Sequence, residues 1–262
     1  MSFKIKNGVL ERYHGDDICV TVPCGITSIG NKAFEGYTNL QEVTLPEGIV
    51  TIGEAAFCNC KNLTTINIPE GVTSIGKLAF GSCNSLETIA IPNSVISIGN
   101  GAFFECKLKS VVIPDSVTSL GKVVFSLCEN LETATLPNGI KSLPDGLFNG
   151  CISLTNVNIP DSVKTIEKSA FDGCEKLADI VIPNGVEEIG KFAFWGCKSL
   201  ESITIPNSVK VISIDTFKDC NKLSTIATDT KIYRNLNSAG IRDCLHDLQA
   251  SIMEYDFDNL VY

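Results

Sequence analysis

The sequence has few of the residues from which catalytic centres are usually built. Its 262 residues include only two histidines, His14 and His246, and one tryptophan. The two histidines lie near opposite ends of the chain, so a Ser-His-Asp or Cys-His centre is hard to assemble. No glycine-rich phosphate loop is present. We therefore expect no enzyme activity and no cofactor.

Positive charge and long apolar runs are also scarce. Lysine and arginine number 21 against 30 acidic residues, a formal net charge of −9. This balance argues against binding to nucleic acid or to an anionic membrane surface, which both need clustered basic side chains. No apolar run approaches the roughly 18 residues of a spanning helix, so we expect no membrane insertion. Residues 1–6 also lack the apolar stretch of a secretory signal.

What the chain does contain is a repeat. Nine prolines follow apolar residues at intervals of 23 residues, with one interval of 22, and each is followed eleven residues later by a phenylalanine. Fourteen residues after each proline stands Tyr37 in the first repeat and a cysteine in the other eight. The consensus is L-x-x-I-x-I-P-[ND]-[GS]-V-x-x-I-G-x-x-A-F-x-x-C-x-x. A unit of this size buries its apolar positions only by stacking on its neighbours.

Each part of the consensus predicts a local structure. The alternating apolar residues before the proline, such as Ile66 and Ile68, have the period of a β-strand. Proline ends the strand because it has no N–H for the ladder, and Pro-Asn-Gly or Pro-Asp-Ser forms a turn. Ala-Phe-x-x-Cys places two apolar side chains three residues apart, which favours a short helical turn.

These motifs closely resemble the BspA-like leucine-rich repeats, whose signature is the same Ile-Pro…Ile-Gly…Ala-Phe…Cys pattern. The resemblance covers about residues 20–228. It implies a repeat solenoid: a right-handed superhelix with a parallel β-sheet on the concave face and short helical turns on the other side. It also implies a bacterial cell-surface or secreted protein that binds proteins of the host or its extracellular matrix. The absence of an export signal keeps a cytoplasmic location as the alternative.

The two ends depart from the repeat. Residues 1–19 alternate around Asn7-Gly8, a strong turn pair, and we expect an N-terminal capping hairpin there. We expect residues 229–262 to form a C-terminal cap, with a helix over about 238–255 from the spacing of its apolar residues. That helix could instead dock a further domain. The single 22-residue interval, at Cys106-Lys107-Leu108, indicates either a shortened loop or a local bend.

Twelve cysteines would suggest metal or disulfide bonds by number alone, but their spacing does not. Eight occur once per repeat at a core position, where a thiol behaves as a small apolar side chain. Cys58-Asn59-Cys60 lacks zinc-pair spacing and a partner pair, so no metal site is expected. Cys19 and Cys24 flank the first strand and could pair if oxidised. The remaining thiols favour a reducing or anaerobic setting.

The candidate binding residues are the outward-facing positions of the pre-proline strands. They form a flat field of Thr, Ser and Asn with few charges and no aromatic residue. This field is either a solvated strand surface, which threonine suits, or an extended face for a protein or glycan. The residues we select on it are Thr88, Ser110, Thr133, Thr135, Asn156, Asn158 and Asp179.

Trp195 is a separate candidate, since it stands three residues after Phe192 within one predicted turn. An exposed aromatic pair can anchor a partner, but it can equally pack on a neighbouring turn. From the sequence we expect a monomeric, non-catalytic binding protein that acts in adhesion or protein contact through its strand face. The alternative is a structural arm or spacer of a larger surface protein, with the C-terminal helix as its contact element.

Overall fold

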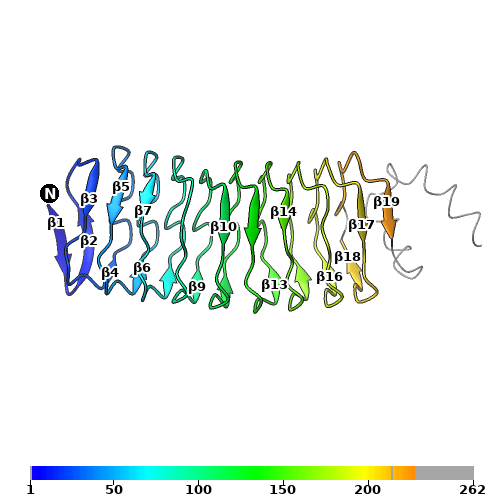
Figure 1. Ribbon diagram of the computed structural model, residues 1–262, viewed down its shortest axis with the longest axis horizontal. Helices are drawn as coiled ribbons and strands as arrows, with labels where there is room; N and C mark the ends of the chain where they lie inside the picture. The colour runs from blue at the N-terminus through cyan, green and yellow to red at the C-terminus, as the bar shows by residue number, and fades with distance from the viewer. Residues whose placement is uncertain (1, 214, 228–262) are drawn as a thin grey trace, which may run out of the picture.

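The chain forms a β-solenoid of stacked coils, seen as a long rod with the N-terminus at one end in Figure 1. The computed structural model describes residues 2–213 and 215–227. Most coils contribute one short strand before the proline and a second after the following turn. Equivalent strands of successive coils lie parallel and in register, which agrees with the solenoid predicted from the repeat.

The segments before the prolines form what we call the pre-proline row. The strands in this row make three parallel sheets, β3-β5-β7, β10-β12-β14 and β17-β19. Their bounds are β3 Cys19–Thr21, β5 Glu42–Thr44, β7 Thr65–Ile66, β10 Ser110–Val112, β12 Thr133–Thr135, β14 Asn156–Val157, β17 Ser202–Thr204 and β19 Thr225–Ala227. Side chains along each three-residue strand alternate exposed, inward and exposed, as strand geometry requires.

A second row of strands lies after the turn in each coil, and we call it the pre-glycine row. The sequence pattern did not distinguish these strands from the turn. The row is built of β4 Ser28–Ile29, β6 Thr51–Ile52, β8 Ser74–Ile75, β9 Ser97–Ile98, β11 Ser119–Leu120, β13 Ser142–Leu143, β15 Thr165–Ile166, β16 Glu188–Ile189 and β18 Val211–Ile212. These two-residue strands are too short to show a period in the sequence. The solenoid therefore has two strand faces rather than one.

The pre-glycine row divides at one coil, and a proline explains the division. In neighbouring coils the residue after the strand donates its N–H to the preceding coil, as Gly99 does to Ile75 and Gly121 to Ile98, both at 2.8 Å. Pro144 occupies this position and has no N–H to donate. The sheet accordingly ends at β11, and a new sheet begins at β13.

The expected short helical turns are absent from the described residues, and that prediction was wrong. The residue two before each ladder phenylalanine and the residue two after it both have left-handed φ, for example Ala55 at 52° and Asn59 at 60° around Phe57. With this backbone conformation, every second N–H group of the turn points toward the next coil. The N–H of Phe57, for example, donates to the carbonyl of Ala79 at 2.7 Å. The intervening N–H groups bond three residues back, as Cys58 does to Ala55.

The core is organised around a ladder of phenylalanines. Nine of them, one per coil, are buried: Phe34, Phe57, Phe80, Phe103, Phe125, Phe148, Phe171, Phe194 and Phe217. Adjacent rings stack with centroids 5.0–5.8 Å apart. Each such aromatic pair contributes about 0.5–1.5 kcal/mol beyond the burial of its area. The ladder therefore links every coil to the next.

The eight repeat cysteines form a second buried ladder with free thiols, which confirms the structural interpretation. Each Sγ–H donates to the carbonyl of the phenylalanine in the preceding coil; Cys106 reaches Phe80 and Cys128 reaches Phe103, both at 3.1 Å. Burial raises the pKa of Cys128 to about 12, because a thiolate would lose its hydration. Cys19 and Cys24, in contrast, are exposed.

At the N-terminus, β1 (Phe3–Lys6) and β2 (Val9–Tyr13) form an antiparallel hairpin that turns at Asn7-Gly8. β2 pairs with β4, so the hairpin closes one end of the pre-glycine row. The Tyr13 ring lies 5.2 Å from Phe34 and ends the phenylalanine ladder. The helix predicted over residues 238–255 lies outside the described residues.

The 22-residue interval leaves the stack unchanged. The rings of Phe103 and Phe125 on either side of it are stacked with an interplanar angle of 2°. Lys107 alone replaces the two-residue turn that Asn84 and Ser85 form in the coil before. The missing residue therefore shortens a loop, as one of the two sequence interpretations held.

Candidate functional site

Seven of the eight predicted site residues lie on the pre-proline row, and all seven are exposed. Strand pairing places Ser110, Thr133 and Asn156 side by side in consecutive coils, and aligns Thr135 with Val112. Thr88 and Asp179 occupy the same repeat position in the two flanking coils, and Asn158 follows Asn156 on the outward side. The structure thus gathers these side chains on one continuous face.

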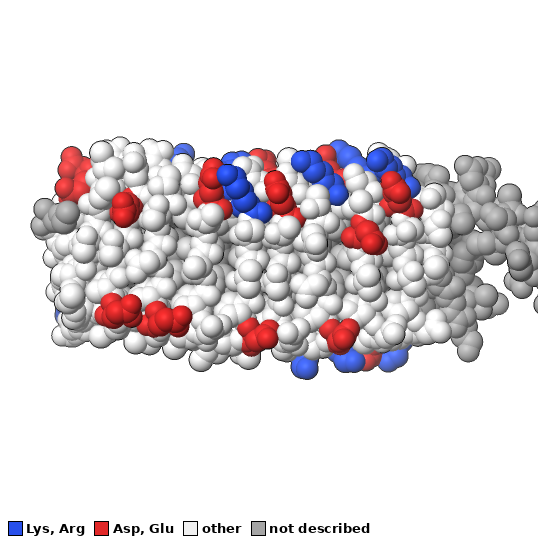
Figure 2. All heavy atoms as spheres, viewed as in Figure 1, with Lys and Arg blue, Asp and Glu red and all other residues white. Residues whose placement is uncertain are grey.

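This face carries almost no charge. Figure 2 shows a broad, mostly uncharged band along the rod, with only a small acidic area within it. Charged side chains border this band above and below. Glu42 and Asp179 are the acidic residues at the outward strand positions of this row.

Along one border of this face, lysines pair with glutamates of adjacent coils, such as Lys109 with Glu87 at 2.6 Å. That pairing raises the pKa of Lys109. Both side chains are exposed, so the pair adds little stability.

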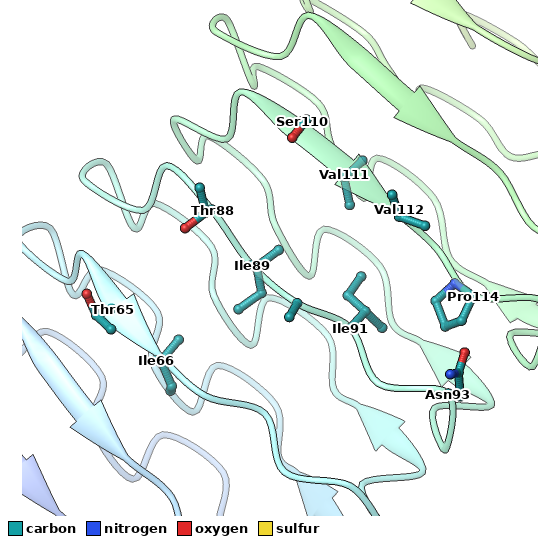
Figure 3. Close-up of a pocket in the computed structure, with 11 residues that line it drawn as sticks. Thr65, Ile66, Thr88, Ile89, Ile91, Asn93, Ser110, Val111, Val112 and Pro114 are labelled. Atoms are coloured by element: carbon teal, nitrogen blue, oxygen red, sulfur yellow. The ribbon is translucent and has the colours of Figure 1, made fainter.

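A hollow of about 600 Å³ opens on this face over the coil that contains Ala90; we call it the Ala90 hollow. Figure 3 shows side chains from three adjacent coils around it, with Thr65, Thr88 and Ser110 toward one end and Asn93 and Pro114 toward the other. Ile66, Ile89 and Val111 contribute its apolar lining. Its volume falls within the range of roughly 300–1,000 Å³ that is typical of ligand sites.

Residues 88–91 beneath this hollow do not join the strand ladder. β7 and β10 flank the segment, but neither pairs with it. Within the described chain, no backbone hydrogen bond involves the N–H or C=O of these four residues. Residues 179–182 have the same property, four coils further along. The pre-proline row is therefore interrupted twice.

A smaller hollow, of about 380 Å³, lies at the second interruption. Its lining includes Asn156, Asn158 and Asp179, together with Ile180 and Val181. Two hollows thus include five of the predicted residues, and Thr133 and Thr135 lie between them. The sequence analysis missed Ala90 as a site residue. The small side chain of Ala90 was the feature that could have indicated it, because most equivalent outward positions hold the larger Thr, Asn or Val.

Trp195 does not join this face. It lies on the Ala-Phe turn, half-buried, with its ring 5.1 Å from that of Phe192. Its indole Nε1 donates to Asp219 of the next coil at 2.6 Å. Packing on the neighbouring turn was one of the two interpretations of this residue, and these contacts agree with it.

The described part of the chain contains no group of three or more His, Cys, Asp or Glu side chains placed to hold a metal ion. His14 is exposed at the N-terminal end, and His246 lies outside the described residues. No helix within those residues has the length and apolar character to cross a membrane. Shape, hydrogen-bonding groups and low charge are what this surface presents to a ligand.

The stacked coils, with a pre-proline strand in most of them and a buried leucine such as Leu63 or Leu131 ahead of it, define a leucine-rich repeat protein. The BspA type leucine-rich repeat region matches residues 18–132 and 120–244, with six copies. These matches span most of the sequence, and the chain belongs to this family. No curated protein sequence matches it.

Solved structures of bacterial leucine-rich repeat proteins share the fold. A leucine-rich repeat protein from Bacteroides ovatus is 32% identical, with a TM-score of 0.75 over 86% of this chain and 68% of its own. The Treponema pallidum protein TpLRR is 25% identical, with a TM-score of 0.53 over 91% and 92%. The pneumococcal vaccine antigen PcpA, at 22% identity and a TM-score of 0.58 over 81% and 63%, is similar in fold alone.

Proposed function

We propose that this chain is a non-catalytic interaction protein that binds another protein through its pre-proline row. The observation that carries the proposal is the exposed, nearly uncharged face formed by Ser110, Thr133, Asn156 and their neighbours, with a hollow at each end. Leucine-rich repeat proteins generally mediate protein contacts, and repeat solenoids present extended surfaces suited to that task. A glycan remains the second class of ligand to test.

The face has the properties of a weak or medium-affinity interface rather than of an enzyme cleft. Hydroxyl and amide side chains supply hydrogen bonds, and the exposed Val112 and Val181 supply apolar area. The aromatic and arginine anchors that dominate tight interfaces do not occur at the outward positions of this row in the described residues. Affinity would then come from many small contacts repeated along the coils.

We also propose that the protein acts outside the cell, on its surface or after secretion, in adhesion. Family membership and the fold shared with PcpA, named as a vaccine antigen, support this location. The free, exposed thiols of Cys19 and Cys24 would then require a low-oxygen or reducing environment to persist.

The test compares two double variants in capture from host-matrix and cell extracts. Thr135→Arg/Asn158→Arg places two large cations on the pre-proline row, where both residues are exposed. Val50→Arg/Thr118→Arg places the same cations at exposed positions beside the pre-glycine row and serves as the matched control. We expect a protein retained by wild type and by the control to be lost from the first variant by at least tenfold.

Unfolding curves of both variants establish that each is folded before capture is compared. Equal retention by the two variants would disprove binding through the pre-proline row. A glycan array incubated with the same three proteins tests the second ligand class, and saturable retention of a glycan but of no protein would replace the protein partner.

A further inference from the structure

The Ala90 hollow has a neutral lining that suits an uncharged side chain. None of the residues that line it carries an ionisable group. Ala90 is among the lining residues, whereas the same repeat position holds Asn67 in the coil before and Val112 in the coil after. A charge placed here would lose its hydration without gaining a partner. An aliphatic side chain of about three or four carbons would instead bury apolar area against Ile66 and Ile89.

The polar groups around the hollow are not engaged elsewhere. In the described residues, the side chains of Thr65, Thr88, Ser110 and Asn93 form no hydrogen bond within the protein. The backbone of residues 88–91 likewise has no hydrogen-bonded partner there. By contrast, hydroxyls of the pre-glycine row pair with each other, as Ser28 does with Thr51 at 2.6 Å. The hollow is therefore rimmed by unused donors and acceptors that match the amide groups of an extended peptide.

Charge distinguishes the two ends of the hollow. Near Thr88, the Glu87 carboxylate is already neutralised by Lys109. At the Asn93 end, Glu70 and Asp115 occupy the same repeat position in the two flanking coils, and both are exposed. Neither carboxylate has a salt-bridge partner among the described residues. Asp115 accepts two hydrogen bonds from Asn138 of the next coil, one from the backbone N–H at 2.8 Å and one from the side-chain amide at 3.2 Å, but these neutral donors leave its negative charge in place. Figure 2 shows acidic side chains spaced along this lower border of the face. This end is complementary to a lysine or arginine.

We propose that the Ala90 hollow binds an extended segment of a partner protein, with an aliphatic side chain over Ala90 and a basic side chain between Glu70 and Asp115. The inference rests on the proposed protein-binding role of the pre-proline row and specifies its ligand. No aromatic side chain lines the hollow, so the ring stacking that commonly holds sugars is missing, and a peptide is favoured over a glycan.

The probe is an array of immobilised ten-residue peptides that differ at two positions, one central and one two or three residues away on either side. There are four classes of peptide, each written as the central residue followed by the outer residue. They are leucine–lysine, leucine–glutamate, glycine–lysine and aspartate–lysine. Labelled wild-type protein is expected to favour the leucine–lysine class at least tenfold over each of the others.

Three variants locate the binding on the protein. Ala90→Val fills the hollow with a side chain that the fold accepts at the same position in Val112 and Val181, and we expect retention of the leucine–lysine peptides to fall at least tenfold. Asp115→Lys sets a cation opposite the Glu70 carboxylate, so the preference for leucine–lysine over leucine–glutamate peptides is expected to be lost. Thr204→Val, at the same repeat position outside the hollow, is the matched control and should bind as wild type does.

Thermal unfolding confirms that each variant is folded before the array is used. The proposal is overturned if no peptide class is preferred, or if Ala90→Val binds as wild type does. An unselective array combined with loss of capture by Thr135→Arg/Asn158→Arg would reject this ligand while leaving the proposed function in place. Failure of both experiments would reject both.

Discussion

At the scale of single residues, the ladder cysteines have two structural roles. Each fills a fully buried position, and its thiol donates a hydrogen bond to a phenylalanine carbonyl of the preceding coil. That carbonyl also accepts a backbone N–H within its own coil, as Phe57 does from Cys60 at 3.1 Å, so the thiol supplies its second hydrogen bond. In the first coil Tyr37 takes the same position, and its hydroxyl donates to the Tyr13 carbonyl. This position therefore carries a side-chain donor in every coil, and cysteine supplies it without the cost of burying a stronger polar group.

Thiol labelling should separate two classes of cysteine. We expect Cys19 and Cys24 to react with a thiol reagent in the native protein, because both are exposed. The eight ladder cysteines should react only after unfolding, when all twelve cysteines of the chain become accessible. Peptide mass mapping after native and denatured labelling measures this. Native labelling of Cys106 or Cys151 at the rate of Cys19 would contradict the buried ladder.

Alkaline pH should destabilise the protein through the same thiols. Burial raises the pKa of seven of them: Cys60, Cys83, Cys106, Cys128, Cys151, Cys174 and Cys197. Their stabilising contribution is complete below the thiol pKa of the unfolded chain, about 8.5, and is lost as pH rises toward the folded pKa. Above about pH 9, the free energy of unfolding should fall by about 1.4 kcal/mol per pH unit for each such thiol.

Urea unfolding measured across this pH range gives the slope. A Cys106→Ala/Cys151→Ala variant removes two of the titrating groups. Its free energy of unfolding should therefore fall less steeply with pH than that of the wild type, by the contribution of two protons. An unchanged slope in that variant would show that other groups cause the alkaline loss.

At the scale of elements, the turns are shaped by contact between coils as well as by local propensity. The glycine after most pre-glycine strands touches the backbone of the preceding coil; a Cβ on Gly99 would lie 2.5 Å from the Lys77 nitrogen. The left-handed positions of the Ala-Phe turn accept many residue types, including Leu78 and Val123, although such residues are strained there. Hydrogen bonds to the next coil maintain that conformation.

Substitution of two glycines should test this close approach. Gly99→Ala forces backbone of adjacent coils apart, and we expect a loss of about 1–3 kcal/mol in the free energy of unfolding. Gly139→Ala is the matched control, because nothing lies within 4 Å of its Cβ and its φ is not left-handed. It should change stability by no more than about 1 kcal/mol. Chemical denaturation compares the two, and equal effects would contradict a contact specific to Gly99.

At the scale of the whole molecule, the solenoid behaves as a one-dimensional stack in which each coil contacts its neighbours. Two continuous ladders, of phenylalanine and of cysteine, pass through it, and salt bridges between adjacent coils line its borders. Because the phenylalanine and cysteine contacts recur from coil to coil, removal of one complete coil should allow the flanking coils to stack directly.

Deletion of residues 137–159, one full 23-residue period, should therefore preserve the fold and reduce stability. The denaturant dependence of unfolding should also decrease, since less surface is exposed. Deletion of residues 137–147 alone breaks the register of every later ladder, and we expect loss of cooperative unfolding. Circular dichroism with urea unfolding measures both deletions. Similar behaviour of the two would show that register between coils is unimportant.

The sequence by itself determined the solenoid, its coil boundaries, its phenylalanine and cysteine columns and the neutral outward positions of the pre-proline strands. This was possible because residues one period apart become spatial neighbours, so a column in the sequence is a column in the molecule.

Only the tertiary structure decided the shape of the Ala-Phe turns, the existence of the pre-glycine row and the position of the two hollows. A Phe-x-x-Cys spacing fits a helical turn and a left-handed turn equally well, and hydrogen bonds from Phe57 and its equivalents to the next coil select the second. The Ala90 hollow arises from one small side chain, a segment without ladder bonds and the walls that two adjacent coils provide. These features depend on how coils approach one another, which no single repeat encodes.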